Sequence, residues 1–194
     1  DARIGDIYLL GHSQGAMLVP RVMQELGAEN FRGGVMLAGS PLPLWELQYH
    51  QNLALLTKVP QENLAAAQES LDAETAKLAD VQKLADDALK TMTFFGISAY
   101  YQKDEMSYDA AQIAIALQKP LLIAQGGKDW QVTPSDGIES WRAVLADQSF
   151  AQYREYPDMN HMLCDMEGDP AGDTSDYQAG STVSEALIRD IASW

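Results

Sequence analysis

A serine flanked by two glycines restricts what this chain can fold into more than any other feature. The pentapeptide GHSQG, residues 11–15, fits the pattern G-x-S-x-G, with Ser13 at its centre. It directly follows an apolar run, residues 7–10, and directly precedes a helix-compatible segment from about Ala16 to Leu26. The pattern predicts a strand, a sharp turn and a helix, with the serine at the turn.

A turn this tight predicts a strained backbone that lifts Ser13 Oγ clear of the sheet. Gly11 and Gly15 are expected to remove the side chains that would collide across the bend. The helix that follows directs its N-terminus at the reacting centre, so we expect the backbone N–H of Gln14 to stabilise a developing oxyanion. This combination favours an activated nucleophile over a chance serine in a turn.

A serine hydroxyl needs a basic partner and an orienting carboxylate to become a good nucleophile. Folds that use G-x-S-x-G place them in the chain order serine, acid, histidine. Asp129 follows a strand expected at residues 120–125, on a glycine-rich bend. His161 follows the next expected strand, residues 152–156, in a loop that begins at Pro157. We therefore predict Asp129 as the acid and His161 as the base.

Other carboxylates and histidines compete for these roles. Asp158 and Asp165 are alternative acids, although both lie too close to His161 in sequence to come from a separate strand end. A lone aspartate after Gly-Gly-Lys is also a common turn residue. His12 is expected to point away from the neighbouring serine, which leaves it packing or substrate contact. His50 lies in a helical segment and is expected at a pocket or on the surface.

Apolar runs separated by helical segments predict a parallel sheet. The runs at residues 34–39 and 120–125 are bounded by glycine and fit strands that are buried on both faces. Helical segments are expected at about residues 16–26 and 134–145, between successive strands. This alternation is typical of an α/β fold.

Strand patterns disappear from about Leu44 to Ala116, where helical patterns take over. Leucines recur there every seven residues, at Leu64, Leu71 and Leu78. Three heptads are too few for a coiled coil, so an amphipathic helix or helical hairpin packed on its own domain is favoured. We predict a core of residues 1–43 and 117–194, with residues 44–116 as a helical insertion.

The last part of the chain predicts a loop and a closing helix. The segment from Glu167 to Thr182 is acidic and rich in Gly, Ser and Thr, as is typical of a surface loop. Residues 183–194 have a helical pattern. One face of this helix is expected to carry four apolar side chains: Val183, Leu187, Ile188 and Ile191.

Composition limits the partners that we expect. Acidic residues outnumber basic ones by 28 to 13, a formal charge of -15 that repels nucleic acid and anionic membranes. No apolar stretch is long enough to suggest a membrane span. Cys164 is the single cysteine, which mildly favours a reducing, cytoplasmic compartment. The three histidines and this cysteine lack the paired spacing of a zinc site, so no metal and no cofactor is expected.

These motifs resemble those of the α/β-hydrolase superfamily, over nearly the whole chain. The stretches that carry the resemblance are residues 8–17, 121–132 and 156–161. Within the superfamily the chain looks like bacterial acyl-ester hydrolases related to dienelactone hydrolases and like the catalytic domain of prolyl oligopeptidases. The resemblance implies a three-layer α/β/α sandwich, a mostly parallel doubly wound sheet, a Ser-Asp-His triad and a helical cap that excludes water from the site.

One departure from the superfamily pattern concerns the strands before the nucleophile. In such a fold the nucleophile follows the fifth strand, whereas only about six residues precede the turn here. We therefore expect strands five to eight, with the nucleophile strand as a bare apolar edge. The amino-terminal half of the fold, with the second oxyanion donor, is expected from a longer chain or from another chain.

The function expected from these features is hydrolysis of a small-molecule ester or acyl substrate through an acyl-enzyme. A peptidase or a thioesterase would use the same triad. A binding or receptor module on a hydrolase scaffold, with the acidic insertion as its docking face, is the alternative from another class. Four side chains are candidates for the substrate pocket: Met17, Trp45, His50 and Trp130.

Overall fold

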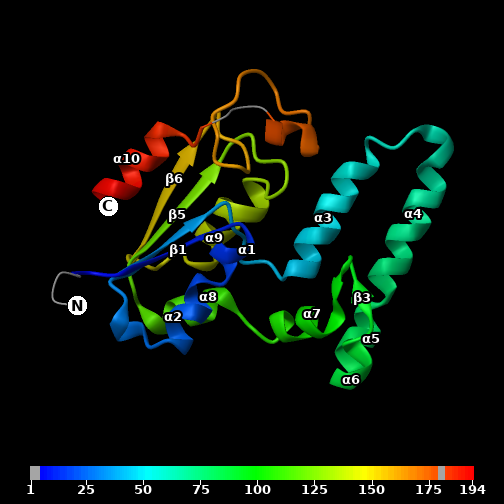
Figure 1. Cartoon of the computed structure of the whole chain (residues 1–194), viewed down its shortest axis with the longest axis horizontal. Helices are drawn as coiled ribbons and strands as arrows, with labels where there is room; N and C mark the ends of the chain where they lie inside the picture. The colour runs from blue at the N-terminus through cyan, green and yellow to red at the C-terminus, as the bar shows by residue number, and fades with distance from the viewer. Residues whose placement is uncertain (1–4, 179–181) are drawn as a thin grey trace. The chain divides into compact units, whose positions relative to one another are not determined.

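The computed structural model describes residues 5–178 and 182–194, which form two compact units (Figure 1). The core unit comprises the chain up to Pro41 together with Asp109–Trp194, and the helical unit comprises Leu42–Tyr108. Residues 1–4 of the expected core and residues 179–181 of the expected loop lie outside the described residues. Each unit has its own interior and is described by itself.

A four-stranded parallel sheet forms the centre of the core unit, in the order β1-β2-β5-β6. Its strands are β1 (Tyr8–His12), β2 (Gly33–Leu37), β5 (Leu121–Gly126) and β6 (Ala151–Tyr156). The expected end of the first strand at Leu10 is wrong. Gly11 and His12 continue the ladder opposite Met36 and Leu37, because pairing with the neighbouring strand outweighs the tendency of glycine to end a strand.

The core unit also contains helices. They are α1 (Gln14–Met17), α2 (Val19–Glu25), η1 (Ala28–Asn30), α8 (Ala110–Leu117), η2 (Ser135–Glu139), α9 (Ser140–Val144), η3 (Thr174–Gln178) and α10 (Glu185–Ser193). Two expected helices are each divided. The segment 16–26 becomes α1 and α2, which meet at Leu18, and the segment 134–145 begins with a π-helical turn, η2, before α9.

The residues of β2 alternate between the two faces of the sheet, and each face packs against a helix. Val35 and Leu37 point to one face, where they share a cluster with Leu187 of α10. Gly34 points to the other, where an added Cβ would lie 2.7 Å from Val19 of α2. A parallel sheet with helices on both faces confirms the predicted α/β fold class.

The closing helix, α10, carries only part of the predicted apolar face. Leu187 is buried and Ile191 packs beside it, as expected for residues four positions apart. Ile188 is 53% exposed, because a neighbouring residue in a helix is turned by about 100°. Val183 precedes α10 and instead forms a bridge with Cys164. The expectation of four apolar side chains on one face is therefore wrong for Val183 and Ile188.

The helical unit contains a hairpin as well as helices. Its elements are α3 (Leu44–Leu56), α4 (Gln61–Ala76), α5 (Leu78–Lys83), α6 (Asp86–Leu89), β3 (Thr93–Phe94), β4 (Ile97–Ser98) and α7 (Ala99–Met106). The expectation that strands are absent here is wrong. Phe95 and Gly96 both have positive φ, 49° and 75°, which fits a two-residue turn that pairs β3 with β4. Phe94 is fully buried in a cluster with Val81, Leu89 and Ala99.

Strand β1 lies at one end of the described sheet order and presents apolar side chains to solvent. Ile7, Tyr8 and Leu10 are each about half exposed. An uncovered edge with apolar side chains is uncommon in stable sheets, because it invites pairing with another strand.

Within the described residues, no helix combines the length and the apolar character that a membrane span requires.

Candidate active site

Ser13 occupies a strained turn between β1 and α1. Its backbone has φ 55° and ψ −125°, a combination that residues with a side chain rarely adopt. Backbone hydrogen bonds hold the turn. The Ser13 N–H donates to the Leu37 carbonyl at 2.8 Å, and the Ala16 N–H donates to the Ser13 carbonyl at 2.9 Å. Such a conformation persists only where the surroundings fix it, as they do here.

The two glycines of the turn have different surroundings. A Cβ at Gly11 would lie 2.2 Å from the carbonyl oxygen of Gly15, so the backbone of α1 passes directly over it. A Cβ at Gly15 would meet no atom within 4 Å. The expectation that a side chain at Gly15 would collide is therefore wrong. Of these two glycines, only Gly11 lies close against other backbone atoms, because a side chain at Gly15 would point away from the bend.

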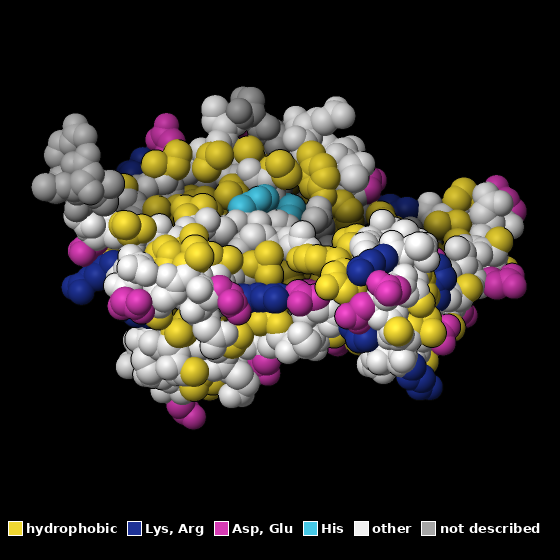
Figure 2. Space-filling model, turned by 60° about the horizontal axis from the view of Figure 1, so that its bottom comes forward, with side chains coloured by type: hydrophobic (Ala, Val, Ile, Leu, Met, Phe, Trp, Pro, Cys, Tyr) yellow, Lys and Arg dark blue, Asp and Glu magenta, His cyan; other side chains and the backbone are white. Residues whose placement is uncertain are grey.

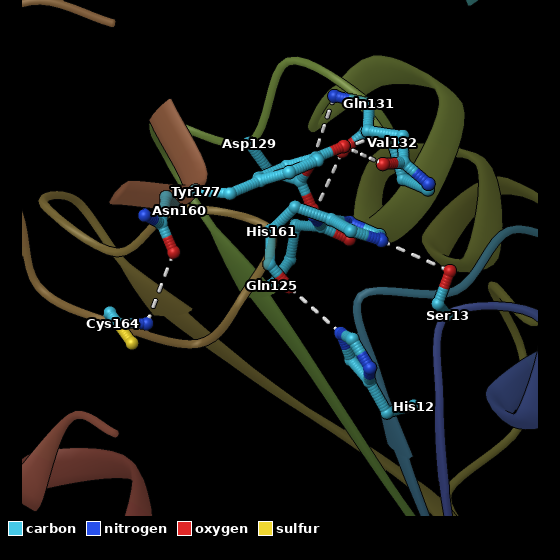
Figure 3. Close-up of polar contacts among 10 residues, drawn as sticks. All are labelled: His12, Ser13, Gln125, Asp129, Gln131, Val132, Asn160, His161, Cys164 and Tyr177. Carbon is cyan, nitrogen blue, oxygen red and sulfur yellow. Dashed lines mark hydrogen bonds and ion pairs between the residues drawn. The ribbon is translucent and has the colours of Figure 1, made fainter. Parts of the chain in front are cut away.

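The imidazole of His161 joins Ser13 to Asp129 (Figure 3). Its Nε2 lies 3.0 Å from Ser13 Oγ, and its Nδ1 lies 2.9 Å from Asp129 Oδ2. Because a carboxylate only accepts, Nδ1 carries the proton and donates, which leaves Nε2 to accept from the serine hydroxyl. The structure thus brings together the three residues that the sequence predicts as nucleophile, acid and base.

Asp129 is 3% exposed and accepts hydrogen bonds on both carboxylate oxygens. Oδ1 accepts from the backbone N–H groups of Gln131 and Val132, at 3.0 and 2.9 Å. Oδ2 accepts from Gln125 Nε2 at 2.8 Å, in addition to His161. A buried carboxylate requires such partners, since an unpaired charge in the interior is costly.

Gln125 is a site residue that the sequence analysis missed. It is 1% exposed near the end of β5, and its Nε2 donates to the Val132 carbonyl at 2.9 Å as well as to Asp129. The amide thereby ties the acid to the backbone of the acid loop, residues 127–134. A signal was present in the sequence, because Gln125 is a polar residue at the end of a strand that is otherwise apolar.

His12 reaches the backbone of the base loop, residues 157–166. Its Nε2 lies 2.7 Å from the carbonyl oxygen of His161, and the two imidazole rings are 5.0 Å apart between centroids. Burial lowers the pKa of His12 below its ordinary value of 6.5, and the nearby His161 lowers it further, against the hydrogen bond to the His161 carbonyl and the Asp129 charge. The expectation of packing or substrate contact did not include this bond.

Asn160, next to the base, fixes the base loop from within. It is 1% exposed, its Nδ2 donates to the Asp176 carbonyl at 3.0 Å, and its Oδ1 accepts from the Cys164 N–H at 3.1 Å. This connection brings η3 to the site. Nothing in the sequence pattern marked Asn160, because its partners are backbone groups, which no residue type identifies.

Tyr177 of η3 contacts the acid loop, although the sequence predicts a surface loop at this position. Its hydroxyl donates to Gln131 Oε1, and its ring stacks on Trp130 with 6.1 Å between centroids. Burial raises the pKa of Tyr177, and the charges of Asp129 and Asp176 raise it further. Trp130, a predicted pocket residue, therefore lies against Tyr177, with its indole Nε1 buried and without a hydrogen bond partner in the described structure.

The remaining predicted residues lie in α1 and in the helical unit. Gln14 is exposed at the first position of α1, and Met17 is 4% exposed in the same helix. Trp45 packs against the cluster around Phe94 in the helical unit, and His50 lies in α3 beside Tyr49.

The competing acids point elsewhere. Asp158, whose side chain is 69% exposed, forms an ion pair with the largely buried Lys128 at 2.8 Å, and Asp165 is exposed. Asp129, by contrast, faces His161 (Figure 3). In the described residues, no three His, Cys, Asp or Glu side chains are grouped as a metal site would need. Figure 2 shows histidine side chains at the molecular surface with hydrophobic side chains beside them.

A parallel sheet between helices, with a serine at the strand-to-helix elbow, defines an α/β-hydrolase. Comparison with known proteins identifies the family. Residues 2–169 match the family model Hydrolase_4, described as serine aminopeptidase, S33, and the chain belongs to this family of hydrolases.

The chain is also similar to individual proteins. The chain is 31% identical over 197 residues to esterase EstD of Thermotoga maritima, covering 98% of the chain and 43% of that esterase. Est1E from Butyrivibrio proteoclasticus has a TM-score of 0.51 at 16% identity, covering 97% of this chain and 63% of Est1E. A hydrolase from Oleispira antarctica has a TM-score of 0.48 at 15% identity, covering 98% of this chain and 67% of that hydrolase. The chain thus spans less than half the length of the curated esterase.

Proposed function

We propose that this chain carries the catalytic triad of a carboxylester hydrolase, with Ser13 as nucleophile, His161 as base and Asp129 as the orienting acid. The observation that carries the proposal is the imidazole of His161, within hydrogen-bond distance of both partners. The identity with a protein named as an esterase supports an ester as substrate. Its chemical class is a small-molecule carboxylic ester.

The reaction proceeds in two halves. His161 Nε2 takes the proton of the Ser13 hydroxyl while Oγ attacks the acyl carbon, and Asp129 stabilises the imidazolium that forms. His161 then gives this proton to the leaving alcohol, which leaves an acyl ester on Ser13. In the second half, His161 takes a proton from water, the hydroxide attacks the acyl carbon, and the proton returns to Ser13 Oγ as the carboxylic acid leaves.

Other parts of the proposal concern the surroundings of the triad. The backbone N–H of Gln14 follows the nucleophile directly and is proposed to support the oxyanion. Met17 and Trp130, which both lie in the core unit, remain candidates for the substrate pocket. Nucleic acid is not proposed as a partner, since the formal charge is -15.

We further propose that the outer side of β1 pairs with a strand from the amino-terminal half of the fold, supplied by a longer chain or another chain. The half-exposed side chains of Ile7, Tyr8 and Leu10 support this. Hydrogen exchange of the β1 amides in the natural protein tests it. Protection of those amides that do not face β2 is expected, and fast exchange would contradict the pairing.

Peptide hydrolysis is the second candidate, because the matching family model is described as serine aminopeptidase. The same triad would serve it, and also a thioesterase, since the three reactions differ in the leaving group. A panel of short-chain esters, acyl thioesters and aminoacyl amides, compared by kcat/KM, separates them. Esters are expected to rank first, and the Ser13→Ala variant is expected to turn over none. A purified natural protein that hydrolyses no member of the panel would favour a binding module.

A further inference from the structure

The base loop is hydrogen-bonded to two different sides of the site. On the acid side, the Lys128 N–H donates to the Met159 carbonyl at 3.0 Å. On the nucleophile side, His12 Nε2 lies 2.7 Å from the His161 carbonyl, across 149 positions of sequence. Figure 3 shows His12 rising from β1 toward the segment that carries His161. The second bond therefore joins the backbone of the base to the strand that directly precedes the nucleophile.

The geometry assigns the proton of His12. A carbonyl oxygen only accepts, so His12 Nε2 must carry a hydrogen and donate. The bond acts on the main chain of His161 and leaves both ring nitrogens of that residue to Ser13 and Asp129. It can therefore persist while the His161 ring gains and loses a proton during the reaction.

We propose that His12 is a positioning residue, whose Nε2–H fixes the His161 backbone so that the base keeps its distance from Ser13 Oγ. The inference rests on the proposed function, because it gives His12 a role in that reaction. His12 and Ser13 are consecutive, so one end of β1 sets the position of both the nucleophile and the base. A shift of the loop would lengthen the 3.0 Å contact between His161 Nε2 and Ser13 Oγ, and misplacement by about 1 Å can lower a rate by a factor on the order of 100.

Two substitutions separate the effect of the N–H donor of His12 from the effect of its aromatic ring. His12→Phe retains an aromatic side chain but removes the donor, whereas His12→Gln retains an N–H donor at a similar distance from the backbone. In the natural protein, His12→Phe is expected to slow fluorophosphonate labelling of Ser13 and ester turnover by roughly 10- to 100-fold. The loss is expected in kcat more than in KM, and His12→Gln is expected to recover most of it.

The controls distinguish this inference from the proposed function. If the unaltered protein is labelled and Ser13→Ala is not, the nucleophile stands, and the His12 variants then test positioning alone. Labelling of His12→Phe at the unaltered rate would overturn the inference. Equal losses in His12→Phe and His12→Gln would also overturn it, because the donor would then not be the cause.

A measurement on the unaltered protein covers the case in which His12→Phe fails to fold. Nitrogen-15 NMR of the histidine rings reports which nitrogen carries hydrogen. A hydrogen on Nε2 of His12 is expected, and a neutral ring with its hydrogen on Nδ1 would overturn the inference. This result does not depend on whether the protein hydrolyses an ester.

Discussion

His161 Nδ1 lies 2.9 Å from Asp129 Oδ2, and their side chains are 3% and 0% exposed. The carboxylate also accepts from Gln125 Nε2 and two backbone N–H groups, so its charge is satisfied without solvent. A buried, fully hydrogen-bonded acid can hold one tautomer of the imidazole and stabilise the imidazolium. This pair determines the direction in which His161 Nε2 faces Ser13.

Replacing the acid tests that relationship. Asp129→Asn is expected to lower kcat for ester hydrolysis by a factor on the order of 10⁴, because an amide nitrogen facing Nδ1 favours the wrong tautomer. Steady-state kinetics with a short-chain ester measures the loss. Asp158→Asn is the matched control, since the Asp158 side chain is 69% exposed, and its kcat is expected to stay within about tenfold of normal. Equal losses in both variants would contradict the assignment of the acid.

Gln125 is expected to contribute to stability through Asp129. Gln125→Met preserves length and burial but removes the donor to both Asp129 Oδ2 and the Val132 carbonyl. The free energy of unfolding is expected to fall by about 1–3 kcal/mol, as when buried polar groups lose a partner. Denaturant titration measures this change. The control is Gln112→Met, at an exposed position of α8, where little change is expected.

The two elbow glycines predict opposite effects of the same substitution. Gly11→Ala places a Cβ against the Gly15 carbonyl and is expected to lower the free energy of unfolding by about 1–3 kcal/mol or more. Gly15→Ala meets open space inside a helix and is expected to raise it by about 0.4–1 kcal/mol. Thermal or denaturant unfolding compares the two. A larger loss at Gly15 than at Gly11 would contradict the packing described for the elbow.

The lowered pKa of His12 predicts how stability depends on pH. The unfolded state binds a proton near pH 6.5, whereas the folded state binds it only at lower pH. The unfolded state therefore holds more protons in this window, and stability is lost as the pH falls from 6.5 toward the folded pKa.

Unfolding titrations from neutral to mildly acidic pH test this dependence. His12→Gln removes the titrating ring, so its free energy of unfolding is expected to fall less over the same range. A steeper fall in His12→Gln than in the unaltered protein would show that the folded state does not disfavour protonated His12.

The parts of the fold set by local sequence could be predicted. The apolar runs of β2 and β5 and the glycine-bounded turn at Ser13 identified the sheet and the elbow. The order serine, acid, histidine selected Asp129 and His161, because parallel strands bring loops at their carboxyl ends together.

Contacts between distant segments could not be predicted. The His12 bond to the His161 carbonyl joins residues 149 positions apart, and no residue type marks a backbone acceptor. Tyr177 reaches Gln131 from the short helix η3, in a segment whose sequence predicts a loop. Ile188 has an apolar side chain of the kind usually found in a core, yet its position around the helix leaves it exposed. Tertiary packing, rather than propensity, decides such positions.

Covalent labelling of Ser13 tests the central claim most directly. The natural protein is treated with a fluorophosphonate, digested, and analysed by mass spectrometry, alongside the Ser13→Ala variant and an Asp158→Asn control. We expect one modified peptide that carries the adduct on Ser13, loss of labelling in Ser13→Ala, and labelling of Asp158→Asn within about tenfold of the normal rate. An adduct on another residue, or undiminished labelling of Ser13→Ala, would contradict the assignment of Ser13 as the nucleophile.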